Sequence, residues 1–412
     1  MKAKIALKPR RHKRLAHFNG GKLRFDRGPA MKDNRIELAD VVRRFKDDYV
    51  AQFGHLIMPS QRKALADIAA CMTAEMGGHQ YQCRDCDHQF WVYHGCRNRA
   101  CPACHGRQMR DWLQARQAEL LPCDYYHIVA TVPEETRHLF LSDQKFMYAL
   151  FMRTVARAVT DLCRDRKYLG ATPGILMVLH TWTGQMHYHP HVHLLVTGGG
   201  VSDDGQSWCE PPGTFLVPVK ALSKLIAARF RDALKKAKPA AFGSLPLKTW
   251  KQPWCSFCKH YGRSRNAVAD YLARYAFRIA ITNARIVAMD DTHVTFKYKQ
   301  RNTGEWALCR LTGVEFLRRF LMHVLPKGFH KLRYYGLWHH SKRDLQQRAR
   351  LLLWLLKPVR LAESLLIADV AAEADCASED QGTSEEEFSP SCPCCGSRRV
   401  EHLQVRCRGP GL

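Results

Sequence analysis

The chain has 412 residues and a mass of 47.3 kDa, enough for two or three domains that each bury a core. Its formal net charge is +26 and its sequence pI is about 9.6, so we expect a polyanionic partner, with nucleic acid as the first choice. No run reaches about 18 apolar residues and no secretory signal is recognisable, which argues against a membrane protein and favours a soluble one.

The charge is unevenly distributed along the chain. Residues 1–30 hold ten Lys or Arg against the single acid Asp26, and they are expected to form a basic arm. Residues 362–390 hold nine Asp or Glu and no Lys or Arg, which predicts an acidic linker.

Apolar residues at helical spacing predict two helices near the start, over 36–53 and 59–74. Two Cys-x-x-Cys pairs follow, Cys83 with Cys86 and Cys101 with Cys104, separated by fourteen residues, and then a predicted helix over 107–121. The four thiolates suit one tetrahedral, structural Zn²⁺ site, for which His94 or Cys96 could replace one ligand. Other cysteines are expected to be buried packing residues; among them are Cys71, Cys163 and Cys309.

Arginines around this cysteine module favour contact with DNA phosphates. They are Arg97, Arg99, Arg107 and Arg110. A solvated face without a ligand is the alternative interpretation.

The middle of the chain alternates between strand and helix patterns. Strands are predicted over 126–133, 175–182 and 191–197, and helical segments over 134–169 and 219–237. Because a strand has a side-chain period of two, His191 and His193 share one face, where two imidazoles can bind a metal. A hairpin of the second and third strands would bring His180 beside His191 as a third ligand. His189 competes for that role, although Pro190 interrupts the strand between them.

A second chemical signal lies in a helical segment over 265–281. Tyr271 and Tyr275 are four residues apart, so both phenols face one side of the helix. Packing of the two rings in a core is the alternative. Beside a metal, however, a tyrosine phenolate can attack a phosphodiester and store its bond energy as a phosphotyrosine, so that rejoining needs no ATP. A metal or the nearby Arg274 and Arg278 would favour the phenolate, since an unperturbed phenol has a pKa of about 10.

Beyond this segment we predict a basic hairpin over 284–287 and 294–298 and a helix over 313–324. Cys255 and Cys258 form a third pair without a nearby partner pair, and we do not expect metal there. At the end of the chain, a second and smaller zinc ribbon is predicted. Its ligands would be Cys392, Cys395, His402 and Cys407. A tail of unpaired cysteines is the alternative.

Five segments together resemble the rolling-circle transposases of the insertion sequence 91 family, the two-tyrosine HUH transposases. They are the cysteine run 83–104, Leu179–Trp182, His189–Gly200, Tyr271–Tyr275 and Arg319–Phe329. The resemblance spans most of the chain. It implies an α+β fold, an HUH endonuclease-like antiparallel sheet with flanking helices, preceded by a small helical and zinc-binding module.

The resemblance also implies roles for particular residues. His191 and His193 would bind a divalent metal, and Tyr271 and Tyr275 would be the nucleophiles. Mg²⁺ or Mn²⁺ is the family's metal, whereas histidine ligands alone would favour zinc or a later transition metal. The implied partner is single-stranded DNA from element ends and targets, in a bacterial cytoplasm at the nucleoid.

The predicted organisation has five parts. These are a basic arm (1–30), a helical DNA-binding domain with a four-cysteine zinc site (31–122), an HUH catalytic domain (123–361), an acidic linker (362–390) and a C-terminal zinc ribbon (391–412). Two other functions stay open at this point: a plasmid relaxase or replication initiator, and a zinc-dependent DNA-binding regulator without a nucleophile.

Overall fold

The computed structural model describes residues 35–105, 120–213, 215–262, 278–356 and 390–408, together with Val268, Tyr271 and Tyr275. The basic arm, nearly all of the acidic linker and most of the helix predicted over 107–121 lie outside the described residues. The chain divides into two compact units. The smaller contains Gly77–Tyr93 and the described part of Thr383–Arg408, and the larger contains the other described residues.

The larger unit is built on an antiparallel sheet with the strand order β11-β4-β5-β3-β7, and β6 pairs with β5. The strands are β3 (Tyr125–Thr131), β4 (Thr172–Trp182), β5 (Tyr188–Val201), β6 (Trp208–Cys209), β7 (Cys255–Gly262) and β11 (Leu332–Gly336). The predicted mixture of helices with an antiparallel sheet is therefore confirmed, as are the three central strands.

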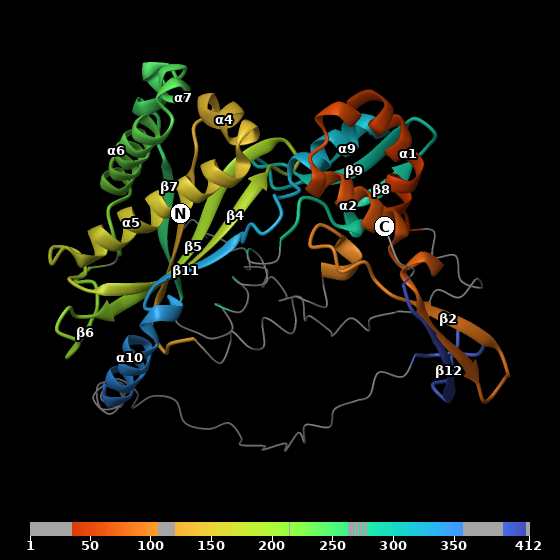
Figure 1. Cartoon of the computed structure of the whole chain (residues 1–412). Helices are drawn as coiled ribbons and strands as arrows, with labels where there is room; N and C mark the ends of the chain where they lie inside the picture. The colour runs from red at the N-terminus through yellow and green to blue at the C-terminus, as the bar shows by residue number, and fades with distance from the viewer. Residues whose placement is uncertain are drawn as a thin grey trace, which may run out of the picture. The chain divides into compact units, whose positions relative to one another are not determined.

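The two faces of this sheet are covered by different helices, because successive side chains of a strand point to opposite sides. Ile128, Met177 and Leu194 face a core that includes side chains of α5 (Gln144–Arg164) and α6 (Val219–Ala237). On the other face, Val178 and Leu195 belong to a core with α10 (Arg343–Leu355) and Tyr271. Figure 1 shows α5 lying across the sheet formed by β4 and β5. The short helices α4 (Arg137–Ser142) and α7 (Pro239–Gly243) complete this part.

In a second core of the same unit, two helices from the N-terminal part of the chain and one from much later in the sequence pack against a small sheet ordered β10-β9-β8. Its elements are α1 (Leu38–Phe53), α2 (Pro59–Ala70), α9 (Gly313–Met322), β8 (Ile286–Met289), β9 (His293–Lys299) and β10 (Trp306–Thr312). Helix α9 begins at a glycine for a steric reason: a Cβ at Gly313 would lie 2.2 Å from the ring of Phe45 in α1. The predicted helices over 36–53, 59–74 and 313–324 and the hairpin over 284–298 are confirmed within a few residues.

The smaller unit is a three-stranded antiparallel sheet ordered β12-β1-β2. It consists of β1 (Gly78–Cys83), β2 (Gln89–Tyr93) and β12 (Val400–Arg406). The sequence analysis assigned these residues to two separate modules, 31–122 and 391–412, and the structure pairs them in one sheet.

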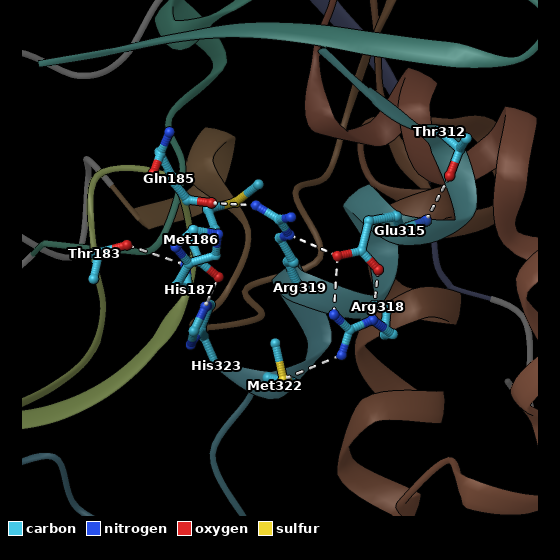
Figure 2. A network of polar contacts seen from close by, with 10 residues as sticks. All are labelled: Thr183, Gln185, Met186, His187, Thr312, Glu315, Arg318, Arg319, Met322 and His323. Carbon is cyan, nitrogen blue, oxygen red and sulfur yellow. Dashed lines mark hydrogen bonds and ion pairs between the residues drawn. The ribbon is translucent and has the colours of Figure 1, made fainter. Parts of the chain in front are cut away.

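The turn between β4 and β5, which leads into the histidine strand, is held by α9 (Figure 2). Arg319 donates to the carbonyl of Gln185 at 3.2 Å, and Glu315 accepts from both Arg318 and Arg319. Met186, whose φ of 60° is unusual for a non-glycine residue, is fully buried in the second core. The turn is thus fixed by burial of Met186 and by charge-assisted bonds.

His323 completes this anchor. Its Nδ1 lies 3.1 Å from the hydroxyl of Thr181. Its Nε2 lies 3.1 Å from the carbonyl of Met186, a contact drawn in Figure 2. Only the neutral ring can accept at one nitrogen while donating at the other. Burial lowers the pKa of His323 from 6.5 to about 4.

None of the described helices has both the length and the apolar character needed to cross a bilayer.

The buried histidine predicts a loss of stability in mild acid. In the unfolded chain His323 takes up a proton near pH 6.5, whereas in the folded protein it resists protonation until about pH 4. The unfolded state therefore binds more protons across this window, and stability falls as the pH falls through it. A shift of one pKa unit corresponds to about 1.4 kcal/mol. Protonation of this side chain therefore lowers the free energy of unfolding by up to about 3 kcal/mol. We expect His323→Gln to show a shallower decline of urea-unfolding free energy between pH 7 and pH 4.5 than the unmodified protein. Parallel declines would contradict this assignment.

Candidate active site and metal centres

Three imidazoles converge on one face of the larger sheet. The pairing of β4 with β5 places His180 directly opposite His191, and His193 is two residues further along the same face. Ligand atoms of the three side chains all lie within 4.8 Å of one another. His180 is buried and His193 is 9% exposed. The structure thus brings together the three histidines that the sequence analysis ranked first.

His180 and His191 each have one ring nitrogen in a hydrogen bond with a backbone carbonyl. Nε2 of His180 lies 2.7 Å from the carbonyl of Tyr275, and Nδ1 of His191 lies 2.7 Å from the carbonyl of His189. A carbonyl only accepts, so these nitrogens carry the protons and the opposite nitrogen of each ring keeps its lone pair. A hydrogen bond to the outer nitrogen also fixes the orientation of a metal-binding histidine.

The sheet face keeps these imidazoles uncharged. Burial, with some help from the charge of Arg278, lowers the pKa of His191 to about 4. The pKa values of His180 and His193 are also depressed, again chiefly by burial. Because a metal binds the neutral ring, the three ligands are ready at neutral pH without losing protons.

His189, the competing third ligand, is engaged elsewhere. Its Nδ1 accepts a hydrogen bond of 2.9 Å from the guanidinium of Arg137. It is absent from the group of three histidines that could hold a metal ion. The geometry favours His180 over His189.

Both tyrosines of the predicted pair reach this site. The ring of Tyr275 lies 4.3 Å from that of His193, and the ring of Tyr271 lies 4.8 Å from that of Tyr275, measured between centroids. Tyr275 is half-buried, whereas Tyr271 is fully buried and its hydroxyl has no hydrogen-bond partner among the described residues. Burial raises the pKa of Tyr271 well above 10. The two phenols therefore differ in access, and burial disfavours ionisation of Tyr271.

His127 is a member of the cluster that the sequence analysis missed. Its Nε2 lies 3.0 Å from Nδ1 of His193, and its ring centroid lies 5.0 Å from that of Tyr271 and 4.8 Å from that of Tyr275. Burial lowers the pKa of His127 to about 4. A polar residue at an alternate position of an otherwise apolar strand was the signal that could have revealed it.

Positive charge lies close to the imidazoles. The charge of Arg278 contributes to the lowered pKa values of all three metal-site histidines. Lys331 donates from Nζ to the carbonyl of Arg278 at 3.2 Å, and burial, aided by the charge of Arg99, lowers its pKa to about 8. Arg274, the other predicted basic residue here, lies outside the described residues. This charge suits a phosphate group in front of the histidines.

A first group of four thiols lies in the larger unit. It consists of Cys71, Cys96, Cys101 and Cys104. Sulfur atoms of Cys71 and Cys104 are 3.5 Å apart, and those of Cys96 and Cys104 are 3.8 Å apart. Tetrahedral zinc with Zn–S bonds of about 2.3 Å separates its thiolates by about 3.8 Å, so this geometry fits a structural Zn²⁺.

The structure therefore does not bring the predicted ligands Cys83, Cys86, Cys101 and Cys104 together as one group. Only the second pair contributes to the first group, joined by Cys96, which had been considered as a substitute, and by Cys71. We had expected Cys71 to be a packing residue, but it follows α2 directly and helical packing brings it to the other thiols. Backbone N–H groups of Cys96 and Arg97 point at the sulfurs of Cys71 and Cys104, both at 3.4 Å.

The structure does not bring the predicted ligands of the other zinc site together either. Cys392 and Cys395 group with Cys83 and Cys86, not with His402 and Cys407. The imidazole of His402 lies on β12, where its Nε2 is 3.1 Å from Nδ1 of His79. Because β12 pairs with β1, the C-terminal cysteines meet the first Cys-x-x-Cys pair across more than 300 residues of sequence.

The arginines that were predicted to contact DNA lie in different surroundings. Arg107 and Arg110 lie outside the described residues, and Arg97 is exposed. The guanidinium of Arg99 donates to three backbone carbonyls; the acceptors are Leu325, Pro326 and Phe329. Arg99 therefore secures a loop of the protein, and three of its hydrogen bonds are made there instead of to DNA.

Comparison with known proteins gives this fold and site a class. A family model described as "Transposase zinc-binding domain" matches residues 41–132, and one described as "Putative transposase" matches residues 174–345. The second range contains the histidine strand and both tyrosines. The protein is a transposase, and DNA is the molecule on which it acts.

The chain belongs to the insertion sequence 91 family of transposases. "Putative transposase y4qJ" of Sinorhizobium fredii is 36% identical over 327 residues, which cover 75% of this chain and 81% of the relative. "Transposase for insertion sequence element IS801" of Pseudomonas savastanoi pv. phaseolicola is 26% identical over 293 residues, covering 66% and 69%. No solved structure matches the chain.

The contrast between two histidines gives a test of the metal site. We expect His180→Ala to weaken Mn²⁺ binding at least about tenfold, measured by calorimetric titration. Removing a residue that only hydrogen-bonds to a metal ligand already weakens binding by about this factor, and loss of a ligand should cost at least as much. His189→Ala, the matched control on the adjacent strand, should bind Mn²⁺ like the unmodified protein. The opposite ranking would make His189 the third ligand.

Proposed function

We propose that this transposase nicks and rejoins single-stranded DNA through 5′-phosphotyrosine intermediates in rolling-circle transposition. Tyr275 and Tyr271 are the nucleophiles in this proposal. His180, His191 and His193 hold Mg²⁺ or Mn²⁺. The observation that carries the proposal is the contact of the Tyr275 ring with His193, beside three neutral imidazoles.

The histidines suit a catalytic metal ion. Three protein ligands leave coordination positions open for phosphate oxygens, and hydrogen bonds to carbonyls hold two of the rings in the required tautomer. When bound, a divalent cation there would polarise the scissile phosphate and stabilise its growing charge. Arg278 and Lys331 add positive charge next to this position.

The tyrosines supply the covalent chemistry. The phenol loses its proton, its oxygen forms a bond to phosphorus, and the bond from phosphorus to the 3′ oxygen breaks. The departing 3′ oxygen takes up a proton, and the 5′ phosphate stays on the tyrosine. Reversal with another 3′ hydroxyl rejoins DNA without an external energy source.

The two tyrosines have unequal tasks in this proposal. Tyr275 attacks first, because it is half-buried and touches His193. Tyr271 is buried and its pKa is raised, so it acts second, after a rearrangement has exposed its hydroxyl. Two tyrosines then permit two successive cleavages, one holding a 5′ end while the other attacks a second strand.

A covalent trapping assay tests this division of labour. Protein, Mn²⁺ and single-stranded oligonucleotides from the element ends should give a protein–DNA adduct. Tyr275→Phe should lower the initial rate of adduct formation at least about 1,000-fold, as loss of a catalytic nucleophile does elsewhere. Tyr271→Phe should form the first adduct but fail to cleave a second strand.

Tyr261→Phe is the matched control, because its ring lies 5.2 Å from that of Tyr271 and it is outside the proposed pair. It should retain both cleavages. An unmodified protein that forms no adduct would favour a DNA-binding regulator. Adducts without excision of a marked element in cells would favour a relaxase or replication initiator.

His127 has a positioning role in this proposal. A proton on Nδ1 of His193, donated to Nε2 of His127, would leave Nε2 of His193 for the metal. His127→Ala should therefore lower Mn²⁺ affinity about 10- to 100-fold, the usual effect of removing such a partner. His260→Ala, an exposed imidazole on neighbouring β7, should bind Mn²⁺ normally. Equal Mn²⁺ affinities in the two variants would contradict this role.

A further inference from the structure

The smaller unit joins two parts of the chain that are far apart in sequence. Strand β1 pairs with β12 from Gly78 opposite Arg406 to Cys83 opposite Val400. At the end of this pairing, the sulfur of Cys83 lies 3.5 Å from that of Cys395, and the sulfur of Cys86 lies 3.6 Å from that of Cys392. All four sulfurs are within 4.8 Å of one another.

These spacings match those of thiolates around tetrahedral zinc, which are about 3.8 Å apart for Zn–S bonds of about 2.3 Å. They are too long for disulfides, in which the sulfurs are about 2.05 Å apart. The four sulfurs are therefore spaced as the ligands of one shared cation would be.

The two cysteine turns, Cys83–Cys86 and Cys392–Cys395, have similar backbone conformations. Each of the two cysteine turns is followed by a residue with positive φ, Asp87 at 54° after Cys86 and Gly396 at 77° after Cys395. The N–H of Asp85 points at the sulfur of Cys83 at 3.4 Å. Such N–H groups stabilise the negative charge of a thiolate.

Polar contacts bind the two turns to each other. Arg399 forms an ion pair of 3.0 Å with Asp85, and the hydroxyl of Ser397 donates to the same carboxylate. The N–H of Arg84 donates to the carbonyl of Arg399 at 2.8 Å. The four thiols are thus held together by a network that does not depend on their own contacts.

The unit has little else to hold it together. Its described core contains only three buried residues, Cys83, Phe90 and Cys392, and two of them are thiol ligands. Folded units of fewer than about 40 residues usually need a metal or disulfides, because their cores bury too little apolar surface. A metal ion would supply the missing stability.

We propose that Cys83, Cys86, Cys392 and Cys395 form a second structural zinc site, which ties the C-terminal segment of the chain to its N-terminal cysteine region. The site is separate from the thiols of the larger unit. Both matched family ranges end before residue 390, so the C-terminal pair is outside them. The proposal does not rest on the DNA chemistry proposed above.

Zinc counting by mass spectrometry on the full-length protein tests the site. The unmodified chain should hold two zinc ions, and Cys392→Ser or Cys395→Ser should hold one. Cys394→Ser is the matched control, because Cys394 is exposed, lies between the proposed ligands and does not belong to the thiol group. Cys407→Ser should also keep both ions. Two ions in Cys392→Ser, or one in Cys394→Ser, would overturn the proposal.

A second measurement tests the link between the segments without relying on a variant that could unfold. A protease site is inserted between residues 357 and 389, and the purified full-length protein is cleaved there. The C-terminal fragment should stay bound to the rest until a zinc chelator is added, and it should rebind when zinc is restored. A fragment that separates while zinc is present, or stays bound after zinc is removed, would show that the metal does not join the two segments.

Discussion

The register of one strand pair determines which face of the sheet carries the histidine cluster of this protein. Pairing of β4 with β5 sets His180 opposite His191, and the period of two then places His193 on the same side. A slip of one residue would turn the imidazoles of β5 into the opposite core. The register is secured from two directions, by apolar side chains facing α5 and α6 and by the attachment of the β4–β5 turn to α9. The distant core formed by α1, α2 and α9 therefore helps to position the histidine cluster.

Burial gives the site its chemical character. The sheet face that holds the histidines also carries an apolar core with Tyr271, so the imidazoles are kept neutral and available to a metal. The same burial disfavours ionisation of Tyr271. Positive charge would favour the phenolate, and Arg278, Lys331 and a bound cation would all supply it. Removing water also strengthens these electrostatic interactions.

The thiol groups show a different way of organising a long chain. Each group consists of cysteines that helix packing or strand pairing brings together when the chain folds. In the first group, packing of α2 brings Cys71 to three cysteines that lie within nine residues of one another, Cys96, Cys101 and Cys104. In the second, sheet pairing brings together segments from opposite ends of the chain. Metal sites of this kind stabilise folded segments that have little apolar core of their own.

The sequence by itself determined the features that depend on local periodicity. Alternation in the histidine strand, helical spacing of Tyr271 and Tyr275, and the apolar patterns of α1, α6 and α9 were all recognisable, because side-chain direction follows from backbone geometry over a few residues. The choice of His180 over His189 followed from the expected hairpin. Tertiary structure alone decided which cysteines lie together and that His127 lies beside His193. Sequence spacing carries no information about partners brought together by sheet pairing and helix packing, since those contacts depend on the arrangement of the whole chain.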